Sequence, residues 1–325
     1  MLVRPLTNGC LMITMTRSLP PVTETASEQG SIAEVWICAS PKAGSGQGRH
    51  EIGLLVDRLR AGLIDVHVTH SIAALRARVA DESRSTARFA VVAAGGDGTL
   101  ALVAQNLPQE IPIVPMPMGT ENLLARYFGY ACRAASVYEC LERAERFSID
   151  AGLANGRMFL VMVTAGMDAE VVRGMHLTRR GHITRWSYAR PIWRAISKYR
   201  FPAITAQEST EDGEVATTSA CWMMAFNLPR YGGGLGIEPG AVADDGKLDR
   251  IALLQGFFFQ GLHYFARIKL GKHLRHRDIS RRRFQRALWT SPERVPYQID
   301  GDYGGRLPLE IEVLPGRVTL LRPST

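Results

Sequence analysis

The segment from Phe89 to Leu100 places the strongest constraint on the fold of this chain. Its first part, Phe89–Ala94, is apolar or small at every position, which is the pattern of a parallel strand covered on both faces. The loop Gly95-Gly96-Asp97-Gly98-Thr99 follows, and residues 99–105 then have the composition of a helix. The segment predicts a phosphate-binding loop, because glycines let backbone N–H groups approach an anion closely and a helix N-terminus attracts negative charge.

Asp97 is unexpected in such a loop. A carboxylate repels phosphate, so this residue indicates a group that holds a metal ion or handles a proton. No Gly-Lys-Ser/Thr follows, which excludes a Walker loop. Glycine and aspartate also dominate ordinary turns, so the letters Gly-Gly-Asp-Gly alone leave a simple turn open. The strand before the loop and the helix after it favour phosphate binding.

Two further loops of similar composition follow predicted strands in the first half of the chain. A strand at 33–39 leads into Ser40–Arg49, which contains three glycines and two cations. A strand at 111–117 leads into Met118–Arg126, a glycine turn at the start of a helix. Parallel strands end at one edge of their sheet, so we expect these loops and Thr69 to lie together. The other elements predicted in this half are a strand at 64–69 and helices at 50–61 and 71–80.

The length of 325 residues and the hydrophobic content of 46% suggest two domains with a substantial core. The net charge of +8 favours an anionic partner, such as a nucleotide, a nucleic acid or an anionic lipid surface. The five cysteines form no C-x-x-C pair, which argues against a zinc site or a disulfide framework and favours reduced thiols in the cytoplasm. No apolar run approaches the roughly 20 residues that a membrane-spanning helix needs.

The composition also divides the chain. Residues 1–30 are predicted to be a disordered leader outside the fold, and residues 31–146 form the α/β domain described above. Short strand-like runs separated by turns then predict a mostly β domain over residues 147–312. These runs lie at 147–150, 158–164, 221–226 and 248–254.

The Gly95–Thr99 loop and the later segment Pro117-Met118-Gly119-Thr120-Glu121-Asn122 together resemble the diacylglycerol kinase catalytic-domain family. That family includes bacterial diacylglycerol kinases and the sphingosine and ceramide kinases; the first loop alone is shared with NAD kinases and phosphofructokinases. The resemblance implies a three-layer α/β domain of the phosphofructokinase and NAD-kinase type with a parallel sheet, followed by a β-sandwich. It also implies that residues 313–325 return toward the first domain. The implied ATP-binding residues are Ser40, Pro41, Lys42, Ala43, Gly44, Thr69, Gly95, Gly96, Asp97, Gly98, Thr99 and Thr120.

The resemblance implies transfer of the γ-phosphoryl group of ATP to a lipid hydroxyl. Three carboxylates receive catalytic roles from it. Asp302, in Asp300-Gly301-Asp302, stands where the family has the Glu of Asp-Gly-Glu, and it is implied to be the general base. Asp97 would organise the magnesium–ATP end, with Asp150 nearby as a supporting carboxylate. A surface Asp-Gly turn is the alternative for Asp302.

The segment Asp244-Asp245-Gly246-Lys247-Leu248-Asp249 is similar to a loop that holds a structural magnesium ion in bacterial members of the family. The implied ligands are the Asp245 side chain and the main-chain carbonyls of Val242 and Lys247. Hard oxygen ligands suit Mg²⁺. A hairpin turn without a metal ion is the alternative.

This sequence departs from the family pattern at three positions. Ser40 replaces an Asn before the Pro-x-x-Gly loop, Val161 replaces an Asn after a Phe, and Asp302 is one methylene shorter than the usual Glu. These departures keep a second possibility open, a catalytically weak membrane-binding protein on the kinase fold. A third possibility is a kinase for a soluble substrate, of the NAD-kinase type, although Asn122 is followed here by Leu123 rather than Glu.

Two segments rich in aromatic and basic residues, 173–200 and 257–283, have the pattern of interfacial elements on anionic lipid. Core-packed helices with a solvated basic face would show the same pattern. Nucleic acid is not expected as a partner, since ATP and lipid account for the positive charge. We therefore expect a cytoplasmic, peripherally membrane-associated enzyme. The sequence leaves the acceptor lipid and the oligomeric state open, with a homodimer among the choices.

Overall fold

The computed structural model describes residues 20–22, 31–40, 46–81, 83, 85–178, 199–210, 212–232, 235–256, 264, 267–268 and 270–323. Several predictions fall outside these residues. They concern most of the leader, the loop residues Pro41, Lys42, Ala43 and Gly44, and large parts of the two aromatic and basic segments, 179–198 and 257–263.

The first half of the chain is an α/β domain with a parallel sheet, as predicted. Strands β1 (Glu34–Ala39), β2 (Asp65–Thr69), β3 (Phe89–Gly95) and β4 (Ile113–Pro117) pair in the order β2-β1-β3-β4. All seven residues of β3 are buried, which is why its sequence shows no alternation. The edge strand β2 is partly exposed, and its sequence alternates.

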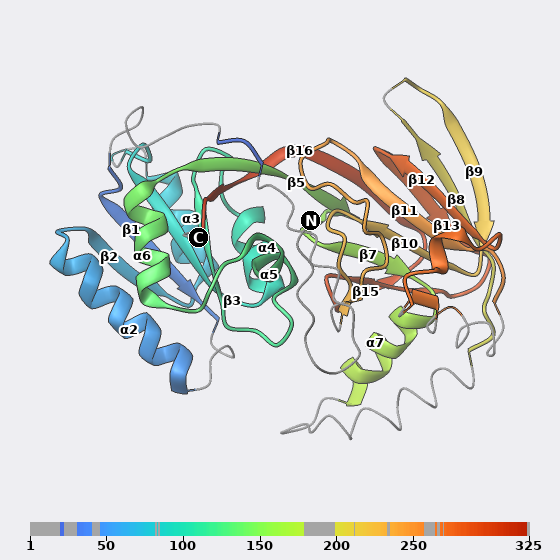
Figure 1. Ribbon diagram of the computed structural model, residues 1–325, viewed down its shortest axis with the longest axis horizontal. Coiled ribbons are helices and arrows are strands. Elements are labelled where there is room, and N and C mark those ends of the chain that lie inside the picture. Colours follow the sequence, from blue (N-terminus) through green and yellow to red (C-terminus); the bar gives the residue numbers. More distant parts are fainter. Residues whose placement is uncertain are drawn as a thin grey trace.

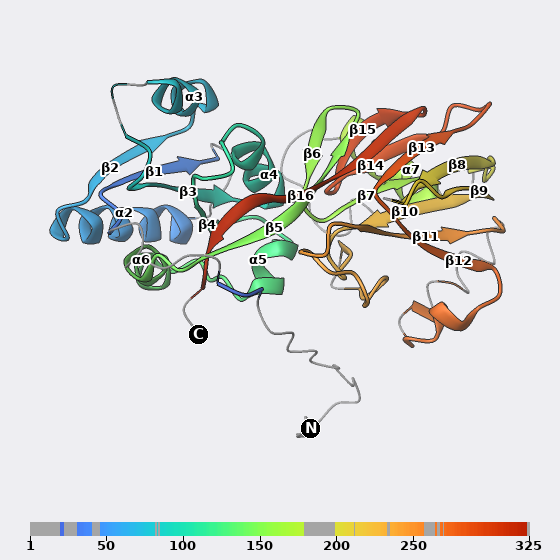
Figure 2. The same ribbon diagram turned by 90° about the horizontal axis from the view of Figure 1, so that it is seen from above.

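Helices cover both faces of this sheet. Figure 2 shows α3 (Ile72–Ala80) and α4 (Asp97–Gln105) above it, with α2 (Gly46–Ala61) and α6 (Ala134–Arg143) below. The short helix α5 (Leu123–Phe128) follows β4. Each loop between a strand and the next helix therefore lies at the carboxyl edge of the sheet, where ligands of open α/β sheets bind.

The second half is a β-sandwich of antiparallel strands, again as predicted. One layer contains β5 (Arg146–Ala154), β6 (Arg157–Phe159), β8 (Ile204–Ser209), β9 (Val215–Ala220), β13 (Arg286–Thr290) and β16 (Leu309–Leu321). The other has the order β12-β11-β10-β7-β14-β15. Its strands are β7 (Met162–Ala165), β10 (Trp222–Phe226), β11 (Leu248–Leu253), β12 (Ile279–Phe284), β14 (Pro296–Ile299) and β15 (Asp302–Arg306).

Two long strands connect the halves. β16 pairs with β13 at its start, with β5 along its length, and in parallel with β4 at Leu320. Figure 1 shows β5 and β16 crossing together from one half to the other. The strands of the first domain and one layer of the sandwich therefore belong to a single ten-stranded sheet, which fixes the two halves against each other.

Two details differ from the sequence-based expectation. The run 158–164 is not one strand, because it divides into β6 and β7 around Leu160 and Val161. Helix α7 (Met167–Thr178) follows β7 in a half that we expected to be mostly β. Among the described residues, no helix is both long enough and apolar enough to cross a membrane.

Candidate active site

The glycines of the loop after β3 let two loops pack backbone against backbone. A Cβ atom built on Gly119 would lie 2.7 Å from the Cα of Gly96, and one built on Gly95 would lie 2.3 Å from the Thr99 hydroxyl. The Gly95 carbonyl accepts a hydrogen bond from the Met118 N–H at 2.8 Å. A side chain at Gly119 would separate the loop after β3 from the loop after β4, and one at Gly95 would collide with Thr99 of its own loop, so both motifs depend on glycine for this packing.

Asp97 joins the same two loops through its carboxylate. Its oxygens accept hydrogen bonds from the N–H groups of Leu123 at 2.8 Å and Leu124 at 3.1 Å, the first residues of α5. Burial raises the pKa of Asp97, and these two hydrogen bonds oppose that rise. Asp97 therefore satisfies the free N–H groups at the start of α5, a role that the sequence did not indicate.

Asn122 completes this arrangement. Its side-chain oxygen accepts from the Gly119 N–H at 2.9 Å, and its amide donates to the Gly119 carbonyl at 2.8 Å. Asn122 itself has a φ of +48°, a left-handed conformation that Asn tolerates better than most residues. The motif residue Asn122 thus closes the loop before α5 on itself and leaves Thr120 exposed.

The other predicted nucleotide contacts lie at the same edge of the sheet. Ser40 follows β1, and its N–H donates to the Ala94 carbonyl at 3.0 Å, next to the glycine loop. Thr69 ends β2, and its hydroxyl accepts from the Ser71 N–H at 3.0 Å. The parallel order of the strands brings Ser40, Thr69, the Gly95–Thr99 loop and Thr120 to one edge.

Asp302 reaches this edge from the other half of the molecule. It begins β15, its side chain is 53% exposed, and one carboxylate oxygen lies 3.6 Å from the position of a Cβ atom on Gly98. The same oxygen accepts a hydrogen bond from the Arg157 guanidinium at 3.0 Å. An exposed carboxylate thus faces the glycine loop, with a cation beside it.

Asp300 has a structural role that sequence reasoning missed. Its carboxylate accepts hydrogen bonds from three consecutive N–H groups, those of Leu160, Val161 and Met162, at 2.9 to 3.0 Å. These bonds divide the 158–164 run into two strands, because these N–H groups bind a side chain instead of a neighbouring strand. Burial raises the pKa of Asp300 to about 6, the three N–H groups oppose this rise, and the negative charge of Asp97 adds to it. The sequence signal that could have indicated this role was the pair of carboxylates in Asp300-Gly301-Asp302.

The raised pKa of Asp300 predicts a dependence of stability on pH. The folded chain takes up a proton at Asp300 near pH 6, whereas an exposed Asp does so near pH 3.9. The unfolded chain then binds fewer protons between pH 4 and 6, so this group makes the folded state more stable as the pH falls. From pH 7 to pH 5 the contribution is about 1 kcal/mol.

Denaturant unfolding of the wild type and Asp300→Asn at both pH values measures this contribution. Asp300→Asn cannot take up the proton, so its unfolding free energy should rise by about 1 kcal/mol less than that of the wild type over this range. An equal change in both proteins would show that Asp300 does not titrate there.

Asp150 is bound by two backbone N–H groups from the second half of the chain. Its carboxylate accepts hydrogen bonds from the N–H groups of Gly246 and Gly316, each at 2.7 Å. Burial raises its pKa, and the nearby charge of Asp245 adds to the rise. Its side-chain hydrogen bonds among the described residues go to the Asp245 loop and to β16, not to the Gly95–Thr99 loop. Asp150 therefore fixes the Asp245 loop in position.

The Asp245 loop offers the donor types that Mg²⁺ prefers. One Asp245 oxygen accepts from the Lys247 N–H at 3.2 Å, and the other lies 3.7 Å from the Arg283 guanidinium. Burial raises the pKa of Asp245, which Arg283 opposes. A carboxylate with the carbonyls of Val242 and Lys247 fits a magnesium ion in ligand type, although Arg283 already supplies positive charge beside the carboxylate.

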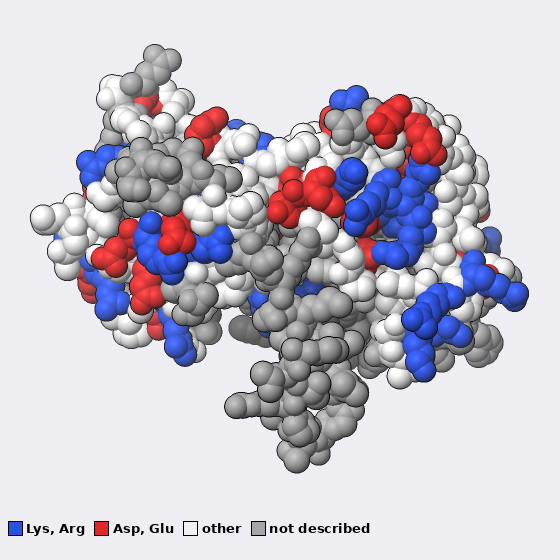
Figure 3. All heavy atoms as spheres, turned by 45° about the horizontal axis from the view of Figure 1, so that its top comes forward, with Lys and Arg blue, Asp and Glu red and all other residues white. Residues whose placement is uncertain are grey.

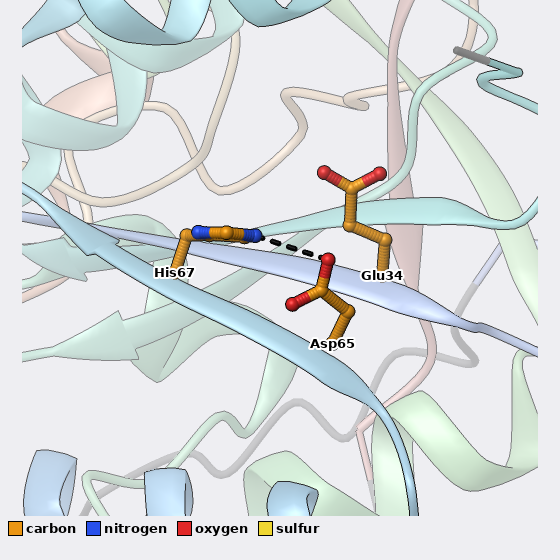
Figure 4. Close-up of side chains that lie close together, drawn as sticks. All are labelled: Glu34, Asp65 and His67. Atoms are coloured by element: carbon orange, nitrogen blue, oxygen red, sulfur yellow. Dashed lines mark hydrogen bonds and ion pairs between the residues drawn. The ribbon is translucent and has the colours of Figure 1, made fainter.

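A second acidic group lies away from this edge. Glu34, Asp65 and His67 bring one ligand atom each within 4.8 Å of one another, and the His67 ring is 3.1 Å from the Asp65 carboxylate (Figure 4). Glu34 already accepts hydrogen bonds from Arg78 at 2.7 Å and from Trp36 at 2.8 Å. Glu34 and Asp65 begin β1 and β2, at the edge opposite the glycine loop. Glu34 is thus paired with Arg78, and Asp65 with His67.

Comparisons with known proteins agree with this architecture. The model of the diacylglycerol kinase catalytic domain matches residues 34–154, and that of the YegS C-terminal NAD kinase beta sandwich-like domain matches residues 161–322. A putative diacylglycerol kinase from Bacillus anthracis has a similar solved structure, with a TM-score of 0.65 and 20% identity over 89% of this chain and 97% of that chain. This likeness shows the fold.

Similar curated sequences have related names. A probable lipid kinase YegS-like protein from Pseudomonas fluorescens is 29% identical over 53% of this chain and 57% of its own length. A diacylglycerol kinase from Mycobacterium tuberculosis is 28% identical over 72% of this chain and 77% of its own. The match thus spans little more than half the length of the first of these relatives. The chain thus combines a diacylglycerol kinase catalytic domain over residues 34–154 with a YegS C-terminal NAD kinase beta sandwich-like domain over residues 161–322.

Proposed function

We propose that this protein is an ATP-dependent kinase that transfers the γ-phosphoryl group to the hydroxyl of diacylglycerol or a related lipid. One observation carries the proposal. The exposed carboxylate of Asp302 faces Gly98 of the glycine loop, with 3.6 Å between its oxygen and the position of a Cβ atom there. Phosphoryl transfer needs a phosphate cradle and a base on the attacking hydroxyl, and these two groups supply them from opposite halves of the molecule.

The proposed reaction divides the work between the two halves. Backbone N–H groups of the Gly95–Thr99 loop bind phosphate oxygens, and Ser40, Thr69 and Thr120 contact the nucleotide, as do residues 41–44. The lipid hydroxyl loses its proton to Asp302 while its oxygen bonds to the γ-phosphorus. The bond from that phosphorus to the bridging oxygen breaks, and ADP leaves with the bond's electron pair. Asp97 organises the phosphate end through the loop and helix that it joins.

Magnesium enters the proposal in two places. A magnesium ion bound with ATP would neutralise the negative charge of the phosphates. A structural ion would bind Asp245 and the carbonyls of Val242 and Lys247, where Asp150 fixes the loop. We also propose peripheral contact with anionic membranes, since the acceptor lipid resides there.

Arg157 provides a test of how Asp302 is positioned. The pair is exposed, with 43% of the Arg157 side chain and 53% of the Asp302 side chain accessible, so the ion pair itself contributes only about 0.2 to 1 kcal/mol. Arg157→Ala is therefore expected to lower kcat by roughly two- to fivefold, and Arg157→Lys by less. Steady-state kinetics on lipid micelles measures both. A complete loss of activity in Arg157→Ala would instead mean that Arg157 acts on the substrate.

The acceptor class is tested by ATP consumption with magnesium. The assay compares micelles of diacylglycerol, micelles of sphingosine, NAD without lipid, and a blank without acceptor. Turnover that depends on a lipid is the expected result. Turnover with NAD alone would identify a kinase for a soluble substrate, and vesicle binding without any turnover would favour the catalytically weak membrane-binding protein.

A further inference from the structure

The connection between β11 and β12 contains a turn, residues 270–277, that is held firmly by backbone and side-chain hydrogen bonds. The His273 side chain is 2% exposed, and its Nε2 lies 2.7 Å from the Ile237 carbonyl. The Lys272 N–H donates to the Arg267 carbonyl at 2.9 Å, and the Gly271 N–H donates to the Ile268 carbonyl at 3.0 Å. Gly271 has a φ of +65°, which favours glycine. The backbone of the turn is therefore preorganised around a buried histidine.

The exposed side chains of this turn are cationic or apolar. Lys272, Arg275 and Arg277 are exposed, and no described residue forms an ion pair with any of the three. Leu270 is 68% exposed beside them. Three cations and one leucine thus face the solvent within eight residues.

The cations of the adjoining strand are already paired with carboxylates. On the adjoining strand β12, Arg281 pairs with Glu238, and Arg283 lies 3.0 Å from Asp249. Figure 3 shows Lys and Arg side chains gathered over the sandwich domain, some beside acidic groups and others apart from them. The positive charge of the turn is therefore available to a partner, whereas most of the positive charge of β12 is paired with carboxylates.

We propose that the 270–277 turn docks on the surface of an anionic phospholipid membrane. The three cations are each exposed at separate positions of one turn, so they fit separate headgroups better than one small anion. The exposed Leu270 suits the boundary between headgroups and acyl chains. The turn has no Phe, Tyr or Trp on which nucleic-acid bases could stack, which argues against single-stranded nucleic acid. This inference rests on the proposed function, because it names the surface that brings the kinase to its lipid.

Vesicle co-sedimentation of the full chain tests the docking surface. Vesicles of phosphatidylcholine alone are compared with vesicles of phosphatidylcholine and phosphatidylglycerol. The test variant carries Lys272→Glu, Arg275→Glu and Arg277→Glu. Its matched control carries Arg60→Glu, Arg133→Glu and Arg294→Glu, which change the net charge equally at exposed positions elsewhere. Thermal unfolding verifies that both are folded.

The wild type and the control variant should bind the anionic vesicles and not the neutral ones. The test variant should bind on the order of 100-fold more weakly, since each of the three cations near an anionic surface contributes roughly fivefold to binding. Leu270→Ser should weaken binding by several-fold. Three results would contradict the proposed docking surface. The test variant could bind like the control, neutral vesicles could be bound as well as anionic ones, or single-stranded RNA that binds the 270–277 turn could displace the protein from the vesicles.

Kinase activity on neutral micelles separates this inference from the proposed function. The test variant should keep wild-type turnover there, because the turn contributes no residue to the candidate active site. If the wild type bound vesicles but had no kinase activity, the proposed function would be contradicted and the proposed docking surface would still be supported.

Discussion

Asp302→Asn is expected to lower kcat by about 10²- to 10⁴-fold, the usual contribution of a positioned general base. Asn keeps the size of the side chain but cannot take the proton of the lipid hydroxyl. The carboxylate is exposed and only Arg157 donates a side-chain hydrogen bond to it among the described residues, so the fold should not suffer. The affinity for ATP should stay near that of the wild type, because the nucleotide contacts come from the first domain.

Asp302→Glu is the matched control, since it keeps the carboxylate and adds one methylene. This variant restores the residue that the family pattern has at the position, and we expect substantial activity. Kinetics on diacylglycerol micelles and calorimetric titration with ATP measure the two effects separately. If Asp302→Asn retained activity within about tenfold of the wild type, another group would have to accept the proton.

Gly119→Ala is expected to have the second-largest effect, through the loop that binds phosphate. Its Cβ atom would lie 2.7 Å from the Cα of Gly96, and the atom that it meets belongs to the backbone and cannot rotate away. Overpacking of this kind costs about 1 to 3 kcal/mol. The two loops should separate, so the affinity for ATP should fall by at least about tenfold together with the unfolding free energy.

Gly53→Ala provides the control for this change. Gly53 lies within α2, and a Cβ atom there meets nothing within 4 Å. Because Ala is the better helix former, the unfolding free energy of this variant should rise by up to about 1 kcal/mol, and the variant should bind ATP normally. Chemical denaturation and ATP titration of both variants make the comparison. Normal ATP binding by Gly119→Ala would show that the contact of the two loops does not support the nucleotide site.

The fold could be predicted from the sequence because its signals are local. The apolar run before Gly95 indicated a strand buried on both faces, and β3 is buried at all seven residues. The alternation at 64–69 indicated a less buried strand, and β2 is the partly exposed strand at the edge of the sheet. Periodicity of this kind depends only on neighbours in the chain and on how many faces of an element are covered.

The contacts that build the candidate site could not be predicted in the same way. Asp97 binds N–H groups 26 and 27 residues later in the chain, and Asp300 binds N–H groups about 140 residues earlier. Hydrogen bonds from a side chain to a distant backbone leave no periodic pattern. The run 158–164 looked like one strand for this reason, since the carboxylate that divides it comes from β14–β15. Asp150 likewise gave no sign that its partners are Gly246 and Gly316.

The central claim is that this chain phosphorylates a lipid hydroxyl, and the transfer of label from ATP tests it most directly. Purified protein is incubated with magnesium, ATP labelled at the γ-phosphate and diacylglycerol micelles, and the lipid is then extracted into organic solvent. Our account predicts label in the extracted lipid with the wild type and Asp302→Glu, and about 10²-fold less or none with Asp302→Asn. Absence of label from every lipid acceptor, with folded protein that binds ATP, would contradict it.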